Sequence, residues 1–347
     1  MTCIVSDACI VSDACIVSDA RIVSDARIAF DARTIGDHYP GIGRYAYGLW
    51  QALGERVAVT LVDPSLKNTR FAISGRTQNS FGVRSLRAQM DAPIKISGAD
   101  VYYSPYYLMP YILPCPAVVT LYDATPLLGP GTPSLKRLAF RLAHWLAGQV
   151  ARRVIVLTES ARAEMAALGV PRKKMIVCPP GLDPKFKPAS PEAIARVKRA
   201  YGLPQEFWLC FGSKKWHKNT QAAVEAMRER SLVIVGRFDK SPYVAEADLP
   251  ALYSAARGLI FPSLREGFGL PVIEAMACGR PVVCFHAPGV KEAAGPAAMM
   301  AEDLTTAALA EAVHQLDNPA IRESKIEAGL KWVKRFTWDA TIAAIES

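Results

Sequence analysis

The feature that most constrains the fold of this chain is an alternation of short apolar segments with amphipathic segments, which occurs twice along the sequence. The first run lies within residues 27–178 and the second within residues 207–285. Strands that alternate with helices favour a parallel sheet with helices on both faces. Between the runs, residues 183–191 are rich in Pro and Lys and lack an apolar period, as expected of a linker. The pattern predicts an α/β fold of two doubly wound domains.

The length agrees with this organisation, because 347 residues exceed the ~100–200 residues of one typical domain. We predict an N-terminal domain over residues 27–185, a C-terminal domain over residues 186–335, and a helix over residues 336–347 that packs back on the N-terminal domain. Residues 3–32 are five tandem hexamers: CIVSDA three times, then RIVSDA and RIAFDA. Since the last copy continues into the first run, we interpret it as the first strand and residues 1–26 as an extension.

Composition narrows the class of protein. The chain is 51% apolar and 21% charged, which is typical of a globular protein with a core. No apolar run approaches the ~20 residues that span a bilayer, and the first residues do not resemble a secretory signal. The eight cysteines include no CxxC pair and no cysteine–histidine cluster at metal-ligand spacing. We therefore expect a soluble, cytoplasmic protein without a metal or other cofactor.

Basic residues are concentrated in the first half of the chain. Residues 27–185 hold 20 Lys and Arg against 10 Asp and Glu, a balance of +10, whereas residues 186–347 hold 20 against 18, a balance of +2. Such an excess predicts a negatively charged partner, which is a phosphorylated substrate or an anionic membrane surface rather than nucleic acid.

The densest chemical signal is PSLREGFGLPVIEAMACGRPVV, residues 262–283. A loop carrying Glu266 follows a buried strand and leads into a helix. Gly267 and Gly269 let backbone amides approach a ligand, and the helix start adds unpaired N–H groups with a partial positive charge. Because Glu274 lies one turn into the helix, two acids bracket a predicted site for a phosphorylated ligand.

Two further loops lie between a strand and a helix. Residues 211–219, FGSKKWHKN, place Lys214 and Lys218 where lysines suit phosphate oxygens. Residues 39–46, YPGIGRYA, nominally fit a G-x-G-x-x-A fingerprint, but seven residues separate the fingerprint from the preceding strand. This spacing disfavours a dinucleotide site. A glycine loop that leads into a helix nevertheless predicts a phosphate contact.

Together these motifs resemble the retaining glycosyltransferases of family 4, and in particular bacterial polysaccharide mannosyltransferases. Members of this family have the GT-B fold, in which two Rossmann-like domains with parallel sheets face each other across a cleft. The resemblance runs from about residue 27 to the carboxyl end, and its most specific part is Glu266-x7-Glu274. Further matching segments are GIGRY (41–45), VIVLTES (154–160), PGLD (180–183), KN (218–219), LPALYSAA (249–256) and FTW (336–338).

The resemblance implies three roles in chemistry and recognition. Glu274 would bind the donor ribose, and Glu266 would lie at the donor sugar. Lys218 would neutralise the leaving diphosphate without a metal ion. Fixed cations and helix dipoles stabilise the charge that develops on such a leaving group.

The resemblance also implies backbone contacts to the donor. The amides of Gly267, Phe268 and Gly269 would lie near the sugar hydroxyls and the diphosphate. Gly43 would let its loop approach the diphosphate from the opposite domain.

The sequence departs from the family pattern in the donor-binding half. Members often have Arg or Lys directly after the glycine that precedes the phosphate lysine, whereas Ser213 stands here. Lys214 or Lys215 is then the candidate for the second charge. Residues 235–249 are short for the usual strand–helix insertion, which puts the wall of the nucleotide pocket in question.

A further departure lies after the strand AVVTL. Many members have a His-Asp pair there, and this chain has Tyr122 and Asp123. Tyr122 can donate to a sugar hydroxyl but cannot act as a base at neutral pH. For Asp123, a catalytic role and a plain helix cap are both open. His217 is a candidate sugar contact because of its neighbours, whereas we expect His144 to be on the surface or packed in the core.

We therefore expect a retaining, metal-independent glycosyltransferase that acts on a glycan or lipid-linked acceptor in bacterial surface polysaccharide synthesis. The GIGRY segment favours GDP-mannose as donor, and a UDP- or dTDP-sugar is the alternative. A non-catalytic nucleotide-sugar-binding protein would lose the charges around Glu266, which this chain keeps. The first glycine loop disfavours a nicotinamide oxidoreductase.

Residues 134–153 predict a long basic helix with an apolar stripe of Leu135, Leu138, Leu142, Trp145 and Leu146. The simplest interpretation is a core-facing stripe with a solvated basic side. The alternative is a peripheral contact with the inner face of the plasma membrane, in which Phe140 and Trp145 are interfacial aromatics.

Overall fold

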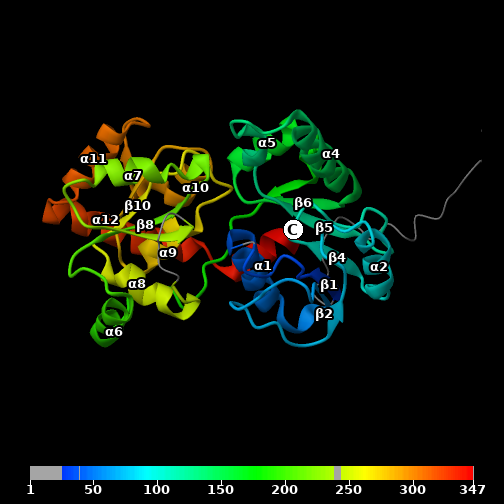
Figure 1. The fold of residues 1–347 in the computed structure, drawn as a ribbon. Helices are drawn as coiled ribbons and strands as arrows, with labels where there is room; N and C mark the ends of the chain where they lie inside the picture. The colour runs from blue at the N-terminus through cyan, green and yellow to red at the C-terminus, as the bar shows by residue number, and fades with distance from the viewer. Residues whose placement is uncertain (1–25, 39, 238–243, 347) are drawn as a thin grey trace, which may run out of the picture.

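The computed structural model describes residues 26–38, 40–237 and 244–346. Apart from Ala26, the predicted extension over residues 1–26 lies outside the described residues. The chain forms two lobes that lie side by side, one from the first half of the sequence and one from the second half (Figure 1). We call them the N-terminal domain and the C-terminal domain.

Each domain is built on one parallel sheet, as the alternating pattern predicts. The N-terminal sheet has seven strands in the order β3-β2-β1-β4-β5-β6-β7, and the C-terminal sheet has five in the order β12-β11-β10-β8-β9. The strand order therefore reverses between β1 and β4 and between β8 and β10. Open α/β sheets bind ligands at the carboxyl ends of the strands beside such a reversal. The strands are β1 (Ile28–Asp31), β2 (Val57–Val62), β3 (Thr77–Asn79), β4 (Val101–Ser104), β5 (Ala117–Leu121), β6 (Arg153–Val156), β7 (Met175–Val177), β8 (Trp208–Ser213), β9 (Leu232–Arg237), β10 (Leu259–Phe261), β11 (Val282–Phe285) and β12 (Met299–Ala301).

Helices cover both faces of the N-terminal sheet, because successive strand residues point to opposite faces. Phe30 lies in the cluster that contains Leu49 of α1, and Ala29 lies in the cluster formed with α2, α4 and α5. The helices of both domains together are α1 (Pro40–Leu53), α2 (Ala88–Lys95), α3 (Thr125–Leu128), α4 (Ser134–Val150), α5 (Glu159–Ala167), α6 (Pro191–Tyr201), α7 (Thr220–Ala226), α8 (Leu249–Ala255), α9 (Leu270–Ala277), α10 (Val290–Ala294), α11 (Thr306–Gln315), α12 (Pro319–Trp332) and α13 (Trp338–Glu346).

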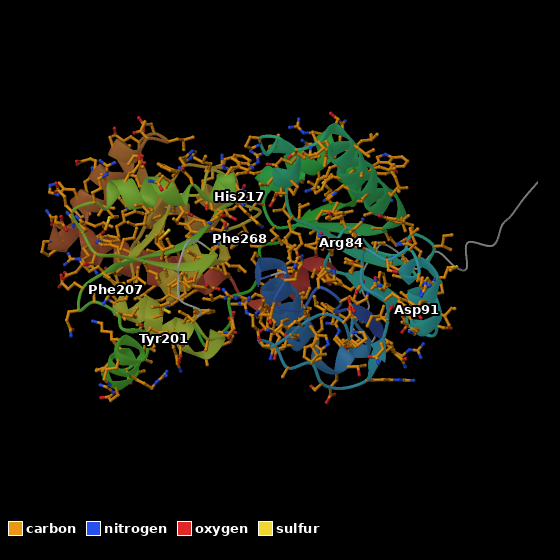
Figure 2. The ribbon with its side chains drawn as sticks, viewed as in Figure 1. Arg84, Asp91, Tyr201, Phe207, His217 and Phe268 are labelled. Carbon is orange, nitrogen blue, oxygen red and sulfur yellow. The ribbon has the colours of Figure 1, made fainter. Side chains whose placement is uncertain are left out.

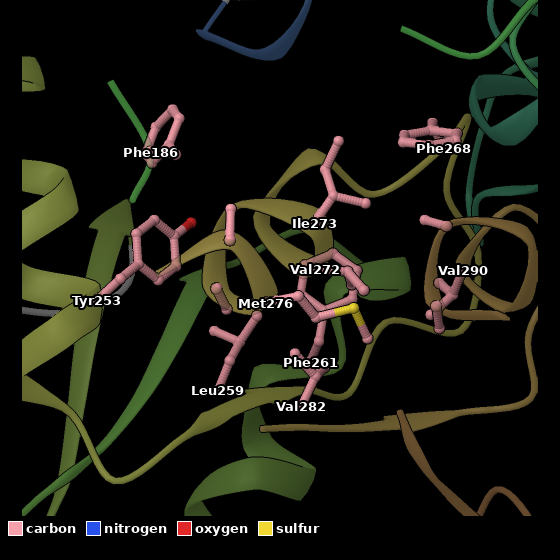
Figure 3. Packing of buried hydrophobic residues seen from close by; sticks show 14 of the residues in the cluster. Phe186, Tyr253, Leu259, Phe261, Phe268, Val272, Ile273, Met276, Val282 and Val290 are labelled. Atoms are coloured by element: carbon pink, nitrogen blue, oxygen red, sulfur yellow. The ribbon is translucent and has the colours of Figure 1, made fainter. Parts of the chain in front are cut away.

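Helix α9 lies in the middle of the C-terminal core. Its side chains belong to the same buried cluster as Phe261 of β10 and Val282 of β11 (Figure 3). Every residue from Val272 to Ala277 is buried. A helix that is buried on all sides is enclosed by the protein, so the start of α9 and the loop before it are held firmly at the edge of the sheet.

The chain crosses between the domains twice. Helix α13 lies against α1 of the N-terminal domain (red in Figure 1). Ring atoms of Trp338 lie 2.2 Å and 2.4 Å from the positions that a Cβ would take at Gly48 and Gly181. The N–H of Leu182 donates to the carbonyl of Phe336 at 2.8 Å. The return of the chain is therefore packed and hydrogen-bonded against the first crossing.

Some elements differ from the prediction. Helix α1 begins at Pro40, so Gly41 and Gly43 belong to its first turn and not to a loop before it. The sequence pattern does not indicate strands β3 and β12 or helices α2, α3, α6 and α10. Strand β3 has only three residues, all polar, and α2 contains Pro93, so neither shows the apolar period on which the prediction relies.

The interpretation of α4 as a helix with a core-facing stripe is wrong. The exposed face carries four large apolar side chains: Leu135, Leu138, Leu142 and Trp145. The buried face carries Phe140, His144, Ala147 and Gly148, so the prediction of Phe140 as an interfacial aromatic is also wrong. Small residues let the helix approach the rest of the domain, since Val170 Cγ1 lies 2.7 Å from the Cβ position of Gly148. The buried face of α4 is therefore the one that allows close packing, and not the one with the most large apolar side chains.

Burial of His144 makes the stability of the fold depend on pH. Its ring centroid lies 3.8 Å from that of Phe140 and 4.0 Å from that of Tyr107, and burial lowers the pKa of His144 to about 4. In the unfolded chain the pKa of histidine is ~6.5. The unfolded state therefore binds more protons between pH 6.5 and pH 4, and stability is lost as the pH falls through this window.

We expect His144 to lower the free energy of unfolding by about 3 kcal/mol between pH 7 and pH 4. Denaturant titrations across this range measure the loss. Because carboxylates also titrate there, the wild type is compared with His144→Phe, which keeps a ring at this position and lacks the titrating group. Identical pH profiles for the two proteins would contradict the assignment.

Candidate active site

The candidate residues lie where the two domains face each other. Lys218 and Glu266 follow β8 and β10, the two strands beside the reversal of order in the C-terminal sheet. Tyr122 and Asp123 follow β5 of the N-terminal sheet. In Figure 2 the side chains of His217 and Phe268 lie between the two lobes.

Lys218 and Glu266 form an ion pair. Lys218 Nζ donates to Glu266 Oε1 at 2.6 Å, and the two side chains are 25% and 13% exposed. Lys218 ends a one-turn 3-10 helix, Trp216–Lys218, that follows β8. The structure therefore brings together the predicted diphosphate cation and the predicted acid at the donor sugar.

The direction of Glu266 is set by a glycine in the next loop. The carbonyl oxygen of Glu266 lies 1.9 Å from the position that a Cβ would take at Gly289, whose φ is +76°. The N–H of Glu266 donates to the carbonyl of Pro288 at 3.1 Å. Only glycine combines this close approach with a positive φ, so residues 288–289 hold the Glu266 backbone in place.

The segment after Glu266 offers backbone donors. The N–H groups of Gly267, Phe268 and Gly269 have no acceptor among the described residues. They directly precede the first turn of α9, in which Pro271 has no N–H and the N–H of Val272 donates to the Gly269 carbonyl at 3.0 Å. The ring of Phe268 packs edge-on against Phe336, with centroids 5.5 Å apart. Because the side chain is packed there, Phe268 can offer a ligand only its backbone. Unpaired amides at a helix start favour an anion.

The N-terminal domain touches this segment at Gly267. A Cβ there would lie 3.1 Å from Asp123 Oδ2 and 3.3 Å from Tyr122 Cβ. The hydroxyl of Thr158 donates to the Gly267 carbonyl at 3.2 Å. A side chain at position 267 would therefore press on Tyr122 and Asp123 of the opposite domain.

Asp123, Tyr122 and His217 differ in what they offer a ligand. Asp123 Oδ1 accepts from the N–H of Thr125, the first residue of α3, at 2.8 Å, while Oδ2 is the oxygen nearest Gly267. The hydroxyl of Tyr122 donates to the Pro105 carbonyl at 2.8 Å and is therefore used within its own domain. Burial and the charges of Lys218 and Lys215 lower the pKa of His217, against the nearby carboxylates of Glu266 and Asp123. A lowered pKa favours the neutral ring, which has one donor and one acceptor nitrogen.

Glu274 is fully buried, and its partners have no assigned role in the sequence analysis. Glu274 Oε2 accepts from the hydroxyl of Tyr253 at 2.6 Å, and Oε1 accepts from Arg44 Nη1 at 2.7 Å. Burial and the Glu274 charge hold the pKa of Tyr253 well above its ordinary value, so this hydroxyl stays a donor. Arg44 belongs to α1 of the opposite domain, directly after Gly43. The sequence signal that could have identified Arg44 as a site residue was its place in the GIGRY segment.

The other predicted donor contacts lie nearby without a distinctive partner. The Ser213 hydroxyl accepts from the N–H of Lys215 at 3.3 Å, and Lys214 is exposed. Gly43 packs in α1, where a Cβ would lie 3.1 Å from the carbonyl oxygen of Thr34. Its contact with a diphosphate stays a prediction. Within the described ranges, no group of three or more His, Cys, Asp or Glu is arranged to hold a metal ion.

Comparison with known proteins places the chain in a family. The model of the glycosyl transferase 4-like domain matches residues 103–181, and the model of glycosyl transferases group 1 matches residues 192–318. The chain belongs to the GT-B glycosyltransferases. Its fold agrees with the structure of Anabaena Alr3699/HepE in complex with UDP-glucose, with a TM-score of 0.73 over 92% of this chain and 98% of that chain at 17% identity.

Among its relatives, this glycosyltransferase is 27% identical over 272 residues to the O-antigen chain mannosyltransferase B of Escherichia coli, which covers 69% of this chain and 71% of the relative. It is 30% identical over 213 residues to the 2-deoxystreptamine glucosyltransferase of Streptomyces kanamyceticus, covering 52% and 55%. These two relatives are named for different sugars. Family membership therefore establishes glycosyl transfer and leaves the donor open.

Proposed function

We propose that this glycosyltransferase moves a sugar from a nucleotide donor with retention at the anomeric carbon and without a metal ion. The observation that carries the proposal is the Lys218–Glu266 pair beside three backbone N–H groups without acceptors. Departure of a nucleoside diphosphate builds negative charge, which a fixed cation and oriented N–H groups stabilise. Lys218 supplies the charge that a metal ion supplies in other enzymes. Retention rests on the resemblance of Glu266-x7-Glu274 to retaining enzymes.

Each residue then has a place along the donor. Glu274 binds the ribose, and the N–H groups of residues 267–269 face the diphosphate and the sugar. Glu266 lies at the sugar, and Asp123 reaches the same loop from the opposite domain. A non-catalytic binding protein would need Glu274 alone, so the retained pair of Lys218 and Glu266 favours an enzyme.

For the donor we propose GDP-mannose, with a UDP- or dTDP-sugar as the alternative. Similarity to the O-antigen mannosyltransferase supports mannose and a glycan or lipid-linked acceptor of bacterial surface polysaccharide. The UDP-glucose of the Anabaena structure supports the alternative.

The test is a panel of GDP-mannose, UDP-glucose and dTDP-glucose, with mass measurement of the free nucleotide and with and without EDTA. Release of GDP from GDP-mannose, unaffected by EDTA, is the expected result. Release of UDP or dTDP would favour the alternative donor, and binding without release from any donor would favour a binding protein. Loss of activity in EDTA that Mg²⁺ or Mn²⁺ restores would contradict the metal-free step. Retention is read from the anomeric coupling of the product by NMR.

We further propose that the outer side of the N-terminal domain contacts an anionic membrane that carries the acceptor. The apolar face of α4 is bordered by exposed Lys136, Arg137 and Arg141. Helix α2 adds exposed Met90 and Ile94, and both helices lie on the side away from the C-terminal domain (Figure 1). A groove of about 510 Å³ at the end of α4 is lined by basic side chains: Arg152, Arg153, Lys173 and Lys174. No described helix is long and apolar enough to cross a membrane.

Co-sedimentation with anionic liposomes measures this contact. Each Lys or Arg near an anionic surface contributes ~1 kcal/mol, so the three residues of α4 suffice for reversible binding. We expect binding at low salt, loss of binding with added salt, and a marked loss in the triple variant Lys136→Glu, Arg137→Glu, Arg141→Glu. The matched control reverses three exposed charges of the C-terminal domain: Arg228, Lys331 and Lys334. A wild type that stays in the supernatant at low salt would refute the contact.

A further inference from the structure

In this structure the Glu274 carboxylate is not accessible to a ligand. One carboxylate oxygen accepts from Arg44 at 2.7 Å and the other from Tyr253 at 2.6 Å, and the Glu274 side chain is 2% exposed. A ribose diol donates its hydroxyl hydrogens to a carboxylate and so needs the same oxygens. Tyr253 is buried in the same domain as Glu274, whereas Arg44 comes from the opposite domain and keeps 19% of its side chain exposed. Arg44 is therefore the partner that has to leave when a ribose binds.

Arg44 can leave without depriving Glu246, its other partner, of all positive charge. Its Nη2 donates to the two oxygens of Glu246 at 3.0 Å and 3.1 Å. Glu246 also pairs with Arg70, and Lys185 Nζ lies 3.8 Å from Glu246 Oε2. The Glu246 carboxylate thus keeps Arg70 as a partner, and Lys185, which pairs with Asp183 at 3.0 Å, lies close to it. In addition, Arg44 Nε is buried and has no hydrogen-bond partner among the described residues.

The diphosphate side of the site can use more than one cation. Lys218 is paired with Glu266, and Ser213 contributes no charge at the end of β8. A nucleoside diphosphate carries at least two negative charges, and the planar guanidinium of arginine suits two phosphate oxygens at once. Arg44 is a cation that the ribose itself would release, and it directly follows Gly43, the predicted diphosphate contact in the first turn of α1.

We propose that Arg44 is a donor-binding residue that exchanges partners. In the free enzyme its guanidinium occupies Glu274. When the donor binds, the ribose hydroxyls take Glu274 and the guanidinium pairs with the diphosphate. This inference rests on the proposed function, because Glu274 has to be the ribose acceptor. The exchange makes binding depend on phosphate, since a nucleoside displaces Arg44 without offering it a new partner.

The experiment compares wild type and Arg44→Ala in calorimetric titrations with GDP, guanosine, UDP and uridine, with weak nucleoside binding measured by competition against the diphosphate. In Arg44→Ala we expect the diphosphate to bind at least tenfold more weakly and the nucleoside to bind equally well or more tightly. Arg44→Lys keeps a cation and is expected to recover part of the diphosphate affinity. The matched control is Arg70→Ala, which removes a cation from Glu246 and none from Glu274.

The ratio of the nucleoside and diphosphate dissociation constants decides the outcome. A ratio that falls at least tenfold in Arg44→Ala and stays constant in Arg70→Ala supports the exchange. Equal weakening of both ligands, or no change in either, overturns it, because a purely structural Arg44 would not separate the two. If the wild type binds neither GDP nor UDP, the proposed function fails instead. Melting temperatures confirm that the variants are folded.

Discussion

Lys218→Ala is expected to lower kcat for sugar transfer by roughly 100- to 1,000-fold while changing nucleoside affinity much less. The reason is that negative charge develops on the leaving diphosphate in the transition state, and removal of one fixed donor at such a position costs about 3–4 kcal/mol. Lys218 is placed for this by the 3-10 turn after β8 and by Glu266 at 2.6 Å. Steady-state kinetics with the donor identified by the panel, together with calorimetry of the nucleoside, measure the two quantities.

Two controls separate this effect from a disturbed site. Lys331→Ala removes an exposed lysine of α12 and should leave kcat unchanged. Since Lys218→Ala leaves Glu266 without its cation, and Glu266 itself lies at the sugar, the double variant Lys218→Ala, Glu266→Gln is compared with Glu266→Gln alone. A double variant as active as Glu266→Gln, or a Lys218→Ala variant within threefold of wild type, would remove the diphosphate role of Lys218.

Glu274→Ala is expected to weaken binding of the nucleoside diphosphate tenfold or more. Loss of a charged acceptor for two ribose hydroxyls costs about 1.5–3 kcal/mol. Glu274 is suited to this role because the Tyr253 hydroxyl fixes one of its oxygens at 2.6 Å and buried α9 holds its backbone. Calorimetry with GDP and UDP gives the affinities. The change acts on binding, whereas Lys218→Ala acts on turnover, so the two variants separate recognition from chemistry.

The buried position of Glu274 requires matched variants. Glu274→Gln keeps the volume and one acceptor oxygen and removes the charge, and Tyr253→Phe removes only the hydroxyl that fixes the carboxylate. We expect Tyr253→Phe to weaken binding less than either change at Glu274. Unchanged affinity in a folded Glu274→Ala protein would rule out the ribose assignment.

The fold was largely predictable from the sequence. Apolar period and the glycines and prolines between segments indicated most strands and helices, because these signals arise within a few neighbouring residues. Two successive rounds of the alternation then implied two parallel sheets. Strand β3 and helix α2 were not predicted, because their local sequences lack that period. The family followed from Glu266-x7-Glu274, where acids, glycines and a helix start lie close together in the chain.

The candidate site was predictable only in part. Lys218 and Glu266 each stand in a recognisable loop at a strand end, so their presence on the same sheet edge could be expected. The sequence did not predict three contacts: the ion pair of Lys218 with Glu266, the approach of Asp123 to Gly267, and the hydrogen bond of Arg44 to Glu274. Arg44 and Glu274 are 230 positions apart, and no local pattern relates two residues whose meeting depends on how the domains face each other.

By itself, then, the sequence determined the fold class, the family and the loops that carry the candidate chemistry, since these depend on periodicity and short motifs. Only the tertiary structure decided which charges meet and which helix faces are buried. Helix α4 illustrates the reason: its large apolar side chains predicted a core-facing stripe, yet Ala147 and Gly148 lie inside because small residues permit close approach to Val170. Burial is decided by the surfaces that an element meets, and those surfaces come from distant parts of the chain.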